Sequence, residues 1–211
     1  MKRGVVLAIG AAALLAVVVV AWNAIRQERE FRRLLSTGDA ALASDRTSQA
    51  IEAFSGALAL KGDSMVAHLK RGDSYRRRGE FPAALRDLRE AASLDQTAPR
   101  PAELLGDVNA AMGRYSRAAE HYRRFIALDD RAPRVLYKLG LTYYRWGRPA
   151  LAIDPLQRAV AIDDKLTEAY YLLGVCLHPD RPADAILALR RAIQLNPAFP
   201  PAREELADVY A

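Results

Sequence analysis

The stretch from Pro133 to Leu166, PRVLYKLGLTYYRWGRPALAIDPLQRAVAIDDKL, contains the pattern that decides the fold. Its eighth residue is Gly140 and its twentieth is Ala152. Counting from Gly140 in steps of 34 residues meets glycine each time, at Gly38, Gly72, Gly106 and Gly174. Alanine recurs in the same register at Ala50, Ala84 and Ala118, and one residue early at Ala185. Because glycine makes up about 7% of average proteins, four such matches have a chance probability on the order of 10⁻⁵. The chain therefore contains an internal repeat.

A unit of 34 residues built as helix, turn and helix is the period of the tetratricopeptide repeat, and this sequence resembles that family. The glycines stand at the family's small eighth position and the alanines at its twentieth. The large residue that the family has four positions later is present in every unit, as Phe54, Leu88, Tyr122, Leu156 and Leu189. The next small position holds Ala57, Ala91, Ala159 and Ala192, and Phe125 is its one departure. The resemblance implies an all-α fold, a right-handed solenoid of helix-turn-helix repeats.

The glycine positions have a physical explanation in helix packing. Two helices approach to about 8 to 10 Å only where the side chains at the crossing are small. Glycine inside a helix costs about 1 kcal/mol relative to alanine, so five such glycines predict five close crossings. Three further glycines, Gly79, Gly113 and Gly147, fall between the two helices of their units, where a left-handed residue ends a helix.

The repeat register predicts the domain organisation. We expect a membrane anchor at residues 1–25 and a solenoid at 26–211, with repeats near 31–64, 65–98, 99–132, 133–166 and 167–199 and a capping half-repeat at 200–211. Aspartates or asparagine at the junctions are expected to act as caps or turn residues, namely Asp95, Asp129, Asp163 and Asn196.

The segment from Gly4 to Ile25 has 22 residues without a charge. As a helix it is about 33 Å long, enough to cross a hydrocarbon core of about 30 Å, so we predict an N-terminal transmembrane helix. A cleaved signal peptide is the alternative, since Lys2 and Arg3 precede the apolar stretch and Val19-Val20-Ala21 is a weak cleavage site. We favour a retained, single-pass anchor in a bacterial inner membrane.

The orientation of such an anchor is a separate question. Lys2 and Arg3 favour a cytoplasmic N-terminus, whereas a second set of cations favours a cytoplasmic C-terminal flank, namely Arg26, Arg29, Arg32 and Arg33. We favour periplasmic over cytoplasmic repeats.

The sequence lacks the patterns of enzyme and metal sites. His68, His121 and His178 lie in different repeats without metal-ligand spacing. Cys176 follows Gly174 closely and is expected to pack rather than react. No glycine-rich phosphate loop or nucleophile elbow is present. We therefore expect no catalytic residue, no metal and no cofactor.

In the family that this chain resembles, the first helices line a concave face that binds peptides. Carried over position by position, the resemblance implies a partner-binding set of cations and tyrosines: Lys70, Arg76, Arg77, Arg134, Tyr137, Lys138, Tyr144, Arg145 and Tyr171. Such a surface suits an extended or acidic peptide segment, because arginine binds carboxylates and tyrosine buries area at low entropy cost. The alternative is an ordinary solvated helix face. The family's two-carboxylate clamp is not reproduced, because Asp39 and Lys70 replace its asparagines.

These features predict a membrane-anchored bacterial scaffold that binds protein partners during assembly of an envelope complex. The alternative is a permanent subunit of a membrane complex, which contacts its partners through the spanning helix or the convex face. The formal charge of +6 and the pI near 9.6 permit nucleic acid as a partner. Acidic residues are interspersed with the arginines, so the charge distribution does not favour it.

Overall fold

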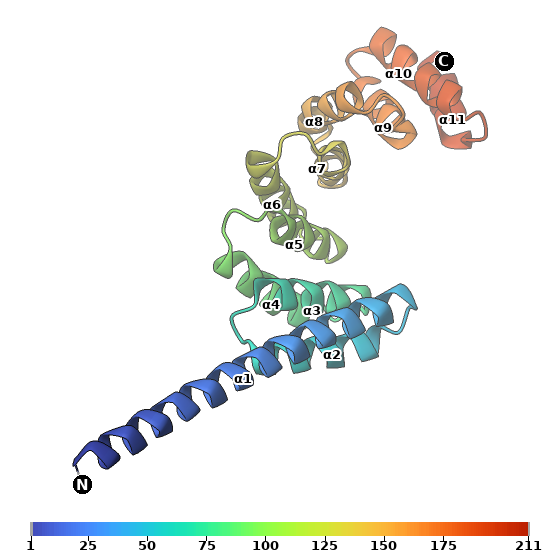
Figure 1. Ribbon diagram of the computed structural model, residues 1–211. Helices are drawn as coiled ribbons and strands as arrows, with labels where there is room; N and C mark the ends of the chain where they lie inside the picture. Colours follow the sequence, from blue (N-terminus) through green and yellow to red (C-terminus); the bar gives the residue numbers. More distant parts are fainter. Residues whose placement is uncertain (1, 211) are drawn as a thin grey trace. The chain divides into compact units, whose positions relative to one another are not determined.

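The computed structural model describes the backbone of residues 2–210 and the side chains of residues 14–210. All regular structure within those residues is helical, which confirms the predicted all-α class (Figure 1). The eleven helices there are α1 (Lys2–Ala43), α2 (Thr47–Leu60), α3 (Met65–Arg77), α4 (Phe81–Leu94), α5 (Pro99–Ala111), α6 (Tyr115–Leu128), α7 (Pro133–Arg145), α8 (Pro149–Ile162), α9 (Thr167–Leu177), α10 (Pro182–Leu195) and α11 (Pro200–Tyr210).

The helices form two compact units, and each is described by itself. Unit 1 ends at Leu94 and contains α1 to α4, and unit 2 begins at Asp95 and contains α5 to α11. Within each unit every helix packs mainly against the next one in the chain. Such nearest-neighbour packing is characteristic of repeat proteins, in which each repeat buries its apolar side against its neighbours.

The five glycines that define the repeat lie at close helix crossings, as predicted. A Cβ atom placed on Gly140 would lie 2.6 Å from Leu156 Cγ, and one on Gly38 would lie 2.3 Å from the Phe54 ring. A Cβ atom on each of the other three would be equally close to a large side chain: 2.9 Å from Leu88 at Gly72, 2.5 Å from Tyr122 at Gly106 and 2.6 Å from Leu189 at Gly174. Each glycine thus packs against the large residue sixteen or, in the last repeat, fifteen positions later, and these large residues are buried.

The turns inside the repeats also follow the sequence prediction. Gly79, Gly113 and Gly147 have φ angles of +77°, +69° and +73°, which favour glycine. At Gly79 the next amide, that of Glu80, donates to the carbonyl of Tyr75 at 2.9 Å, so the turn satisfies an orphan carbonyl of α3. The first repeat has Asp45 in the equivalent place with a φ of +54°, and it closes the same turn without glycine.

Four of the junctions between repeats share one hydrogen bond. The side chain of Asp95 accepts from the amide of Thr97 at 2.9 Å. At three further junctions, the amides of Arg131, Lys165 and Ala198 donate in the same way to the side chains of Asp129, Asp163 and Asn196, at 3.0 to 3.1 Å. These side chains are therefore turn residues, as predicted.

The prediction of a single-pass membrane protein is contradicted. Among the residues that the structure describes, no helix is long and apolar enough to cross a membrane. Of the predicted span, residues 4–13 lie outside the described side chains. Charged residues follow the span from Arg26 onward.

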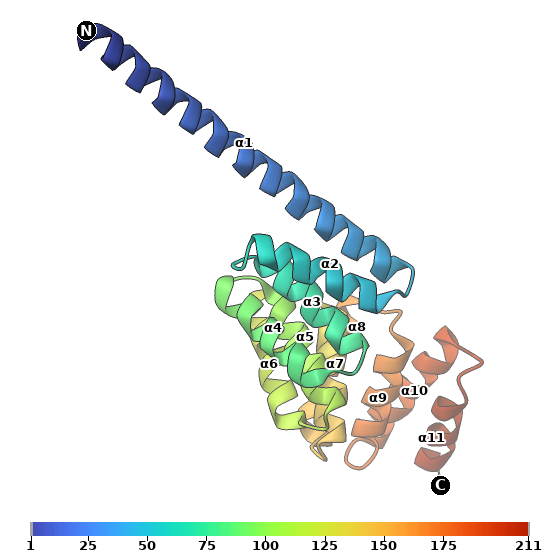
Figure 2. The same cartoon turned by 90° about the horizontal axis from the view of Figure 1, so that it is seen from below.

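Helix α1 runs unbroken from Lys2 to Ala43, so the N-terminal helix continues without a break into the first repeat. Figures 1 and 2 both show its first half extending beyond the helices of unit 1 against which its second half packs. The large apolar side chains from Leu14 to Ile25 are exposed. The guanidinium of Arg26 lies over the ring of Trp22 at 5.6 Å.

Candidate functional site

The nine predicted binding residues all lie on the first helices of their repeats, but they fall into two units. Lys70, Arg76 and Arg77 lie on α3 of unit 1. The other six lie in unit 2, five of them on α7 and Tyr171 on α9. Each group is therefore considered as a surface of its own unit.

The three cations of unit 1 are bound to carboxylates of the same unit. Lys70 Nζ donates to Asp39 Oδ1 of α1 at 2.6 Å. Arg76 Nε and Arg77 Nε both donate to the half-buried carboxylate of Asp73, at 2.8 and 3.2 Å. A partner's carboxylate would have to compete with these bonds, so these three cations offer little free positive charge.

Lys138 in unit 2 is engaged in the same way. Its ammonium group donates to Glu103 Oε1 at 2.7 Å and to Asp107 Oδ2 at 2.9 Å. Asp107 also accepts from the Tyr122 hydroxyl at 2.7 Å, and Arg100 makes a second ion pair with Glu103. Lys138 therefore links α5 to α7 as part of a network.

The electrostatics of this network follow from burial. Glu103 is only 8% exposed, and burial by itself would raise the pKa of its carboxyl group. Hydrogen bonding and charge from Lys138, together with Arg100, outweigh burial and lower that pKa below its ordinary value. The network thus depends on Lys138 to keep a buried carboxylate charged.

Lys70 and Lys138 reveal a recurring contact that the sequence prediction missed. In both cases a lysine at the sixth position of one repeat bonds an aspartate at the ninth position of the preceding repeat, 31 residues earlier. The sequence contains the spacing of 31 residues twice, from Asp39 to Lys70 and from Asp107 to Lys138, and this repeated spacing could have indicated the contact. Both lysines are predicted to bind a partner, and in the structure each links two neighbouring first helices.

The remaining predicted residues of unit 2 are differently placed. Arg134 and Arg145 are exposed, and neither makes an ion pair with any residue that the structure describes. Tyr144 is 42% exposed, and Tyr137 and Tyr171 are half-buried. We call the set of Tyr137, Tyr144, Arg145 and Tyr171 the tyrosine surface.

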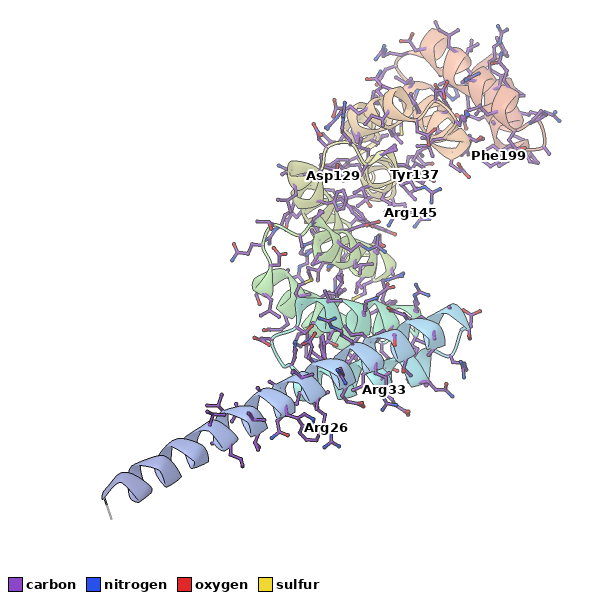
Figure 3. The ribbon with its side chains drawn as sticks, in the orientation of Figure 1. Arg26, Arg33, Asp129, Tyr137, Arg145 and Phe199 are labelled. Atoms are coloured by element: carbon purple, nitrogen blue, oxygen red, sulfur yellow. The ribbon has the colours of Figure 1, made fainter. Side chains whose placement is uncertain are left out.

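Two observations indicate that the members of the tyrosine surface are neighbours. Burial, followed by the charge of Glu168, raises the pKa of Tyr137, and Arg145 opposes that rise. Burial also raises the pKa of Tyr171, with smaller contributions from Glu205 and Tyr144. Figure 3 shows Tyr137, Arg145 and Phe199 along one side of unit 2.

Phe199 extends the tyrosine surface beyond the predicted residues. Its ring meets that of Tyr171 edge to face, with centroids 5.3 Å apart. Phe199 lies in the junction before α11 rather than on a first helix, so assignment by helix position could not find it.

A hollow of about 310 Å³ adjoins Arg145, between α5, α6 and α7. Tyr115, Leu141 and Lys138 also line it. Since Lys138 is held by Glu103 and Asp107, Arg145 is the cation in this wall that is free to bind a carboxylate.

The residues considered for catalysis have structural roles. Cys176 is buried in the apolar core of unit 2, and burial raises the pKa of its thiol to about 11, so the thiolate is scarce at neutral pH. His68 lies between the Asp87 carboxylate and the Gly62 carbonyl, at 3.1 and 3.0 Å. Among the described residues, no group of three or more histidine, cysteine or acidic side chains is arranged to hold a metal.

Comparison with known proteins identifies the repeat. A family model described as tetratricopeptide repeat matches residues 35–101 and 103–166, which is more than half of the chain. No curated protein matches the chain.

Solved structures of the same fold match most of the chain. A structure described as MamA protein has a TM-score of 0.73 at 23% identity, covering 81% of this chain and 93% of its own. YrrB, described as a TPR protein with an unusual peptide-binding site, has a TM-score of 0.72 at 17% identity, covering 86% and 95%. The Pseudomonas aeruginosa protein pilF has a TM-score of 0.68 at 19% identity, covering 87% and 90%. At these identities the likeness establishes the fold.

Proposed function

Because this chain belongs to the tetratricopeptide repeat family, we propose that it is a non-catalytic scaffold that binds protein partners, and that the tyrosine surface of unit 2 holds an extended segment of such a partner. Proteins of this family generally mediate protein–protein interactions. The assembly of an envelope complex remains a prediction from the sequence resemblance.

The observation that carries this proposal is the contrast between Arg145 and the engaged cations. Lys70, Arg76, Arg77 and Lys138 each bind a carboxylate of the chain itself, whereas Arg145 lies beside Tyr137 and Tyr144 without an ion pair among the described residues. Tyrosine and arginine are enriched among the residues that contribute most to binding energy at interfaces.

The same contrast defines the chemistry of the partner. The tyrosine surface offers three phenol rings and one nearby free guanidinium, so it suits aromatic or aliphatic side chains with a single carboxylate opposite Arg145. Glu168, which raises the pKa of Tyr137, adds a negative charge to the same surface. The sequence predicts an extended or acidic segment, and we therefore propose that this segment is extended and mainly apolar. The crystal structure described for YrrB supports peptide binding by this fold.

Selection from a random peptide library against the full chain tests this proposal. We expect Tyr144→Ala combined with Arg145→Ala to weaken the selected peptides by at least about tenfold, which corresponds to about 1.4 kcal/mol. Arg76→Ala combined with Arg77→Ala is the matched control in unit 1 and should leave their affinity unchanged. Equal affinity for both double variants would overturn the proposal.

A permanent subunit of a larger protein complex is the second candidate function. It is favoured by the exposed apolar side chains of α1 between Leu14 and Ile25, since exposed apolar patches commonly mark interaction sites. Purification of the chain from its native cells distinguishes the two. A permanent subunit remains in a stoichiometric complex after Arg145→Ala, whereas a scaffold that uses the tyrosine surface loses its partner.

A further inference from the structure

A second hollow in unit 2, of about 500 Å³, is bounded by the second helices α6 and α8 and by Leu139 and Tyr143 of α7. We call it the outer hollow. It shares no lining residue with the tyrosine surface. Its wall includes Arg123, Ile126, Tyr143, Leu151, Pro155 and Arg158.

The floor of the outer hollow is apolar and partly open to solvent. Ile126 and Tyr143 are half-buried against the core of unit 2. Leu151 projects beside them with 52% of its surface exposed. An exposed leucine next to half-buried apolar side chains provides contact area for an incoming apolar group.

The rim of the outer hollow carries two arginines and one aspartate, namely Arg123, Arg158 and Asp154. Arg123 makes no ion pair with any residue described by the structure, and Arg158 is 3.9 Å from Asp154, whose side chain is 81% exposed. A contact of that length between exposed groups contributes little, so both guanidinium groups are available to another carboxylate.

The repeat pattern singles out this place. At the nineteenth position, where this repeat has Leu151, the other repeats have Gln49, Ala83, Arg117 and Asp184. At the twenty-third position, where it has Pro155, they have Ala53, Asp87, His121 and Ala188. Among the five repeats, the fourth alone has leucine at the nineteenth position and proline at the twenty-third.

Both choices are locally unfavourable. Pro155 lies in the interior of α8, so the carbonyl of Leu151 lacks the amide hydrogen that would normally bond it four residues later. The exposed side chain of Leu151 stays in contact with water, so it contributes little hydrophobic stabilisation. Local choices that work against stability are expected where a protein has a function to perform. Here two of them line the same hollow.

We propose that the outer hollow is a second protein-binding site, which takes a short segment with a large apolar side chain next to acidic ones. The apolar side chain packs on Leu151, Ile126 and Tyr143. The adjacent carboxylates pair with Arg123 and Arg158, whose charge no carboxylate of the chain neutralises closely within the described residues. Because this site and the tyrosine surface share no lining residue, one molecule can bind two segments at once.

A labelled peptide tests the proposal by fluorescence anisotropy on the full chain. The probe is fluorescein-Asp-Glu-Phe-Leu-Glu-Asp-amide, and the matched probe has lysine in place of each acidic residue. We expect the acidic probe to bind at least about tenfold more tightly than the basic one. Leu151→Gln, which installs the residue of the first repeat, and Arg123→Glu should each weaken it by about tenfold or more.

Two controls separate this site from the rest of the chain. Arg124→Glu changes the same charge on the adjacent exposed residue, which does not line the hollow, and should leave affinity nearly unchanged. Tyr144→Ala with Arg145→Ala should also leave it unchanged, so failure of the tyrosine surface is recognised separately. Absence of binding, equal loss with Arg124→Glu, or loss only with the Tyr144 and Arg145 changes would each overturn the proposal.

Discussion

Helix α3 of unit 1 and helix α7 of unit 2 occupy equivalent places in their repeats, and each has a lysine that bonds an aspartate of the preceding repeat. On α3 the neighbouring arginines also bind a carboxylate, that of Asp73. On α7 the corresponding region has tyrosines and Arg145, which is free of ion pairs among the described residues. The comparison teaches that a cation on a first helix is available to a partner only where no carboxylate lies within reach of it.

The largest effect on stability is expected at the close helix crossings, which occur in equivalent places within each unit. Gly140→Leu in unit 2 and Gly72→Leu in unit 1 force a side chain into space that Leu156 or Leu88 already fills. We expect each to lower the free energy of unfolding by about 3 kcal/mol through overpacking. Chemical denaturation followed by circular dichroism measures the loss.

The control for this change is Ala161→Leu, at an exposed position of α8, which should have little effect. If either glycine variant melted within about one degree of the parent, the close crossing in that unit would be refuted.

The next effect separates the two lysines. Lys138→Met leaves the buried carboxylate of Glu103 and the half-buried one of Asp107 without their shared ammonium group, so we expect a loss of about 2 kcal/mol in unfolding free energy. Lys70→Met leaves Asp39, whose side chain is 49% exposed, and should cost at most about 1 kcal/mol. Equal losses of stability in the two variants would show that burial of the carboxylates does not determine what each lysine contributes.

The pH dependence of stability sharpens the same test. Lys138 and Arg100 lower the pKa of Glu103 below 4.5, so its contribution to stability is fully present above about pH 4.5 and is lost as the pH falls through the folded-state value. Lys138→Met leaves burial as the larger influence and raises that pKa. We therefore expect acid unfolding of the variant to begin at a higher pH than in the parent, as measured by urea denaturation across pH 3 to 7.

The sequence predicted the fold because its signals are local or strictly periodic. Gly140 and Leu156 meet because the repeat fixes their separation, and Gly147 ends a helix through its own φ angle. The sequence also placed Lys138 on the correct helix. Its pairing with Glu103 depends on side-chain directions across two helices, which a list of helix positions does not include. The predicted membrane span rested on residues 4–25 alone, without any packing constraint.

A smaller effect on stability is expected in the turns inside the repeats. The turn of the first repeat has Asp45 where the next three repeats have glycine. Asp45 adopts a left-handed φ where Gly79, the turn residue of the second repeat, does so without strain. Asp45→Gly should therefore stabilise the chain by about 1 kcal/mol, and Gly79→Asp should destabilise it by a similar amount. Thermal melts of the two variants check the opposite signs. A shift in the same direction for both would contradict the equivalence of the turns.

The smallest expected effect on stability is that of Arg145→Ala, and it tests the comparison most directly. The guanidinium of Arg145 is exposed and has no ion pair within the described part of the chain, so its removal should change the unfolding free energy by no more than about 0.5 kcal/mol. Lys138→Met is its counterpart on the same helix, seven residues earlier. Removing a side chain that serves binding lowers the protein's affinity for its partner and leaves its stability unchanged. Removing a side chain that serves packing lowers the stability and leaves the affinity unchanged. If Arg145→Ala destabilised the chain as much as Lys138→Met, the free guanidinium would be a structural group like the others, and the tyrosine surface would lose the charge that distinguishes it from α3.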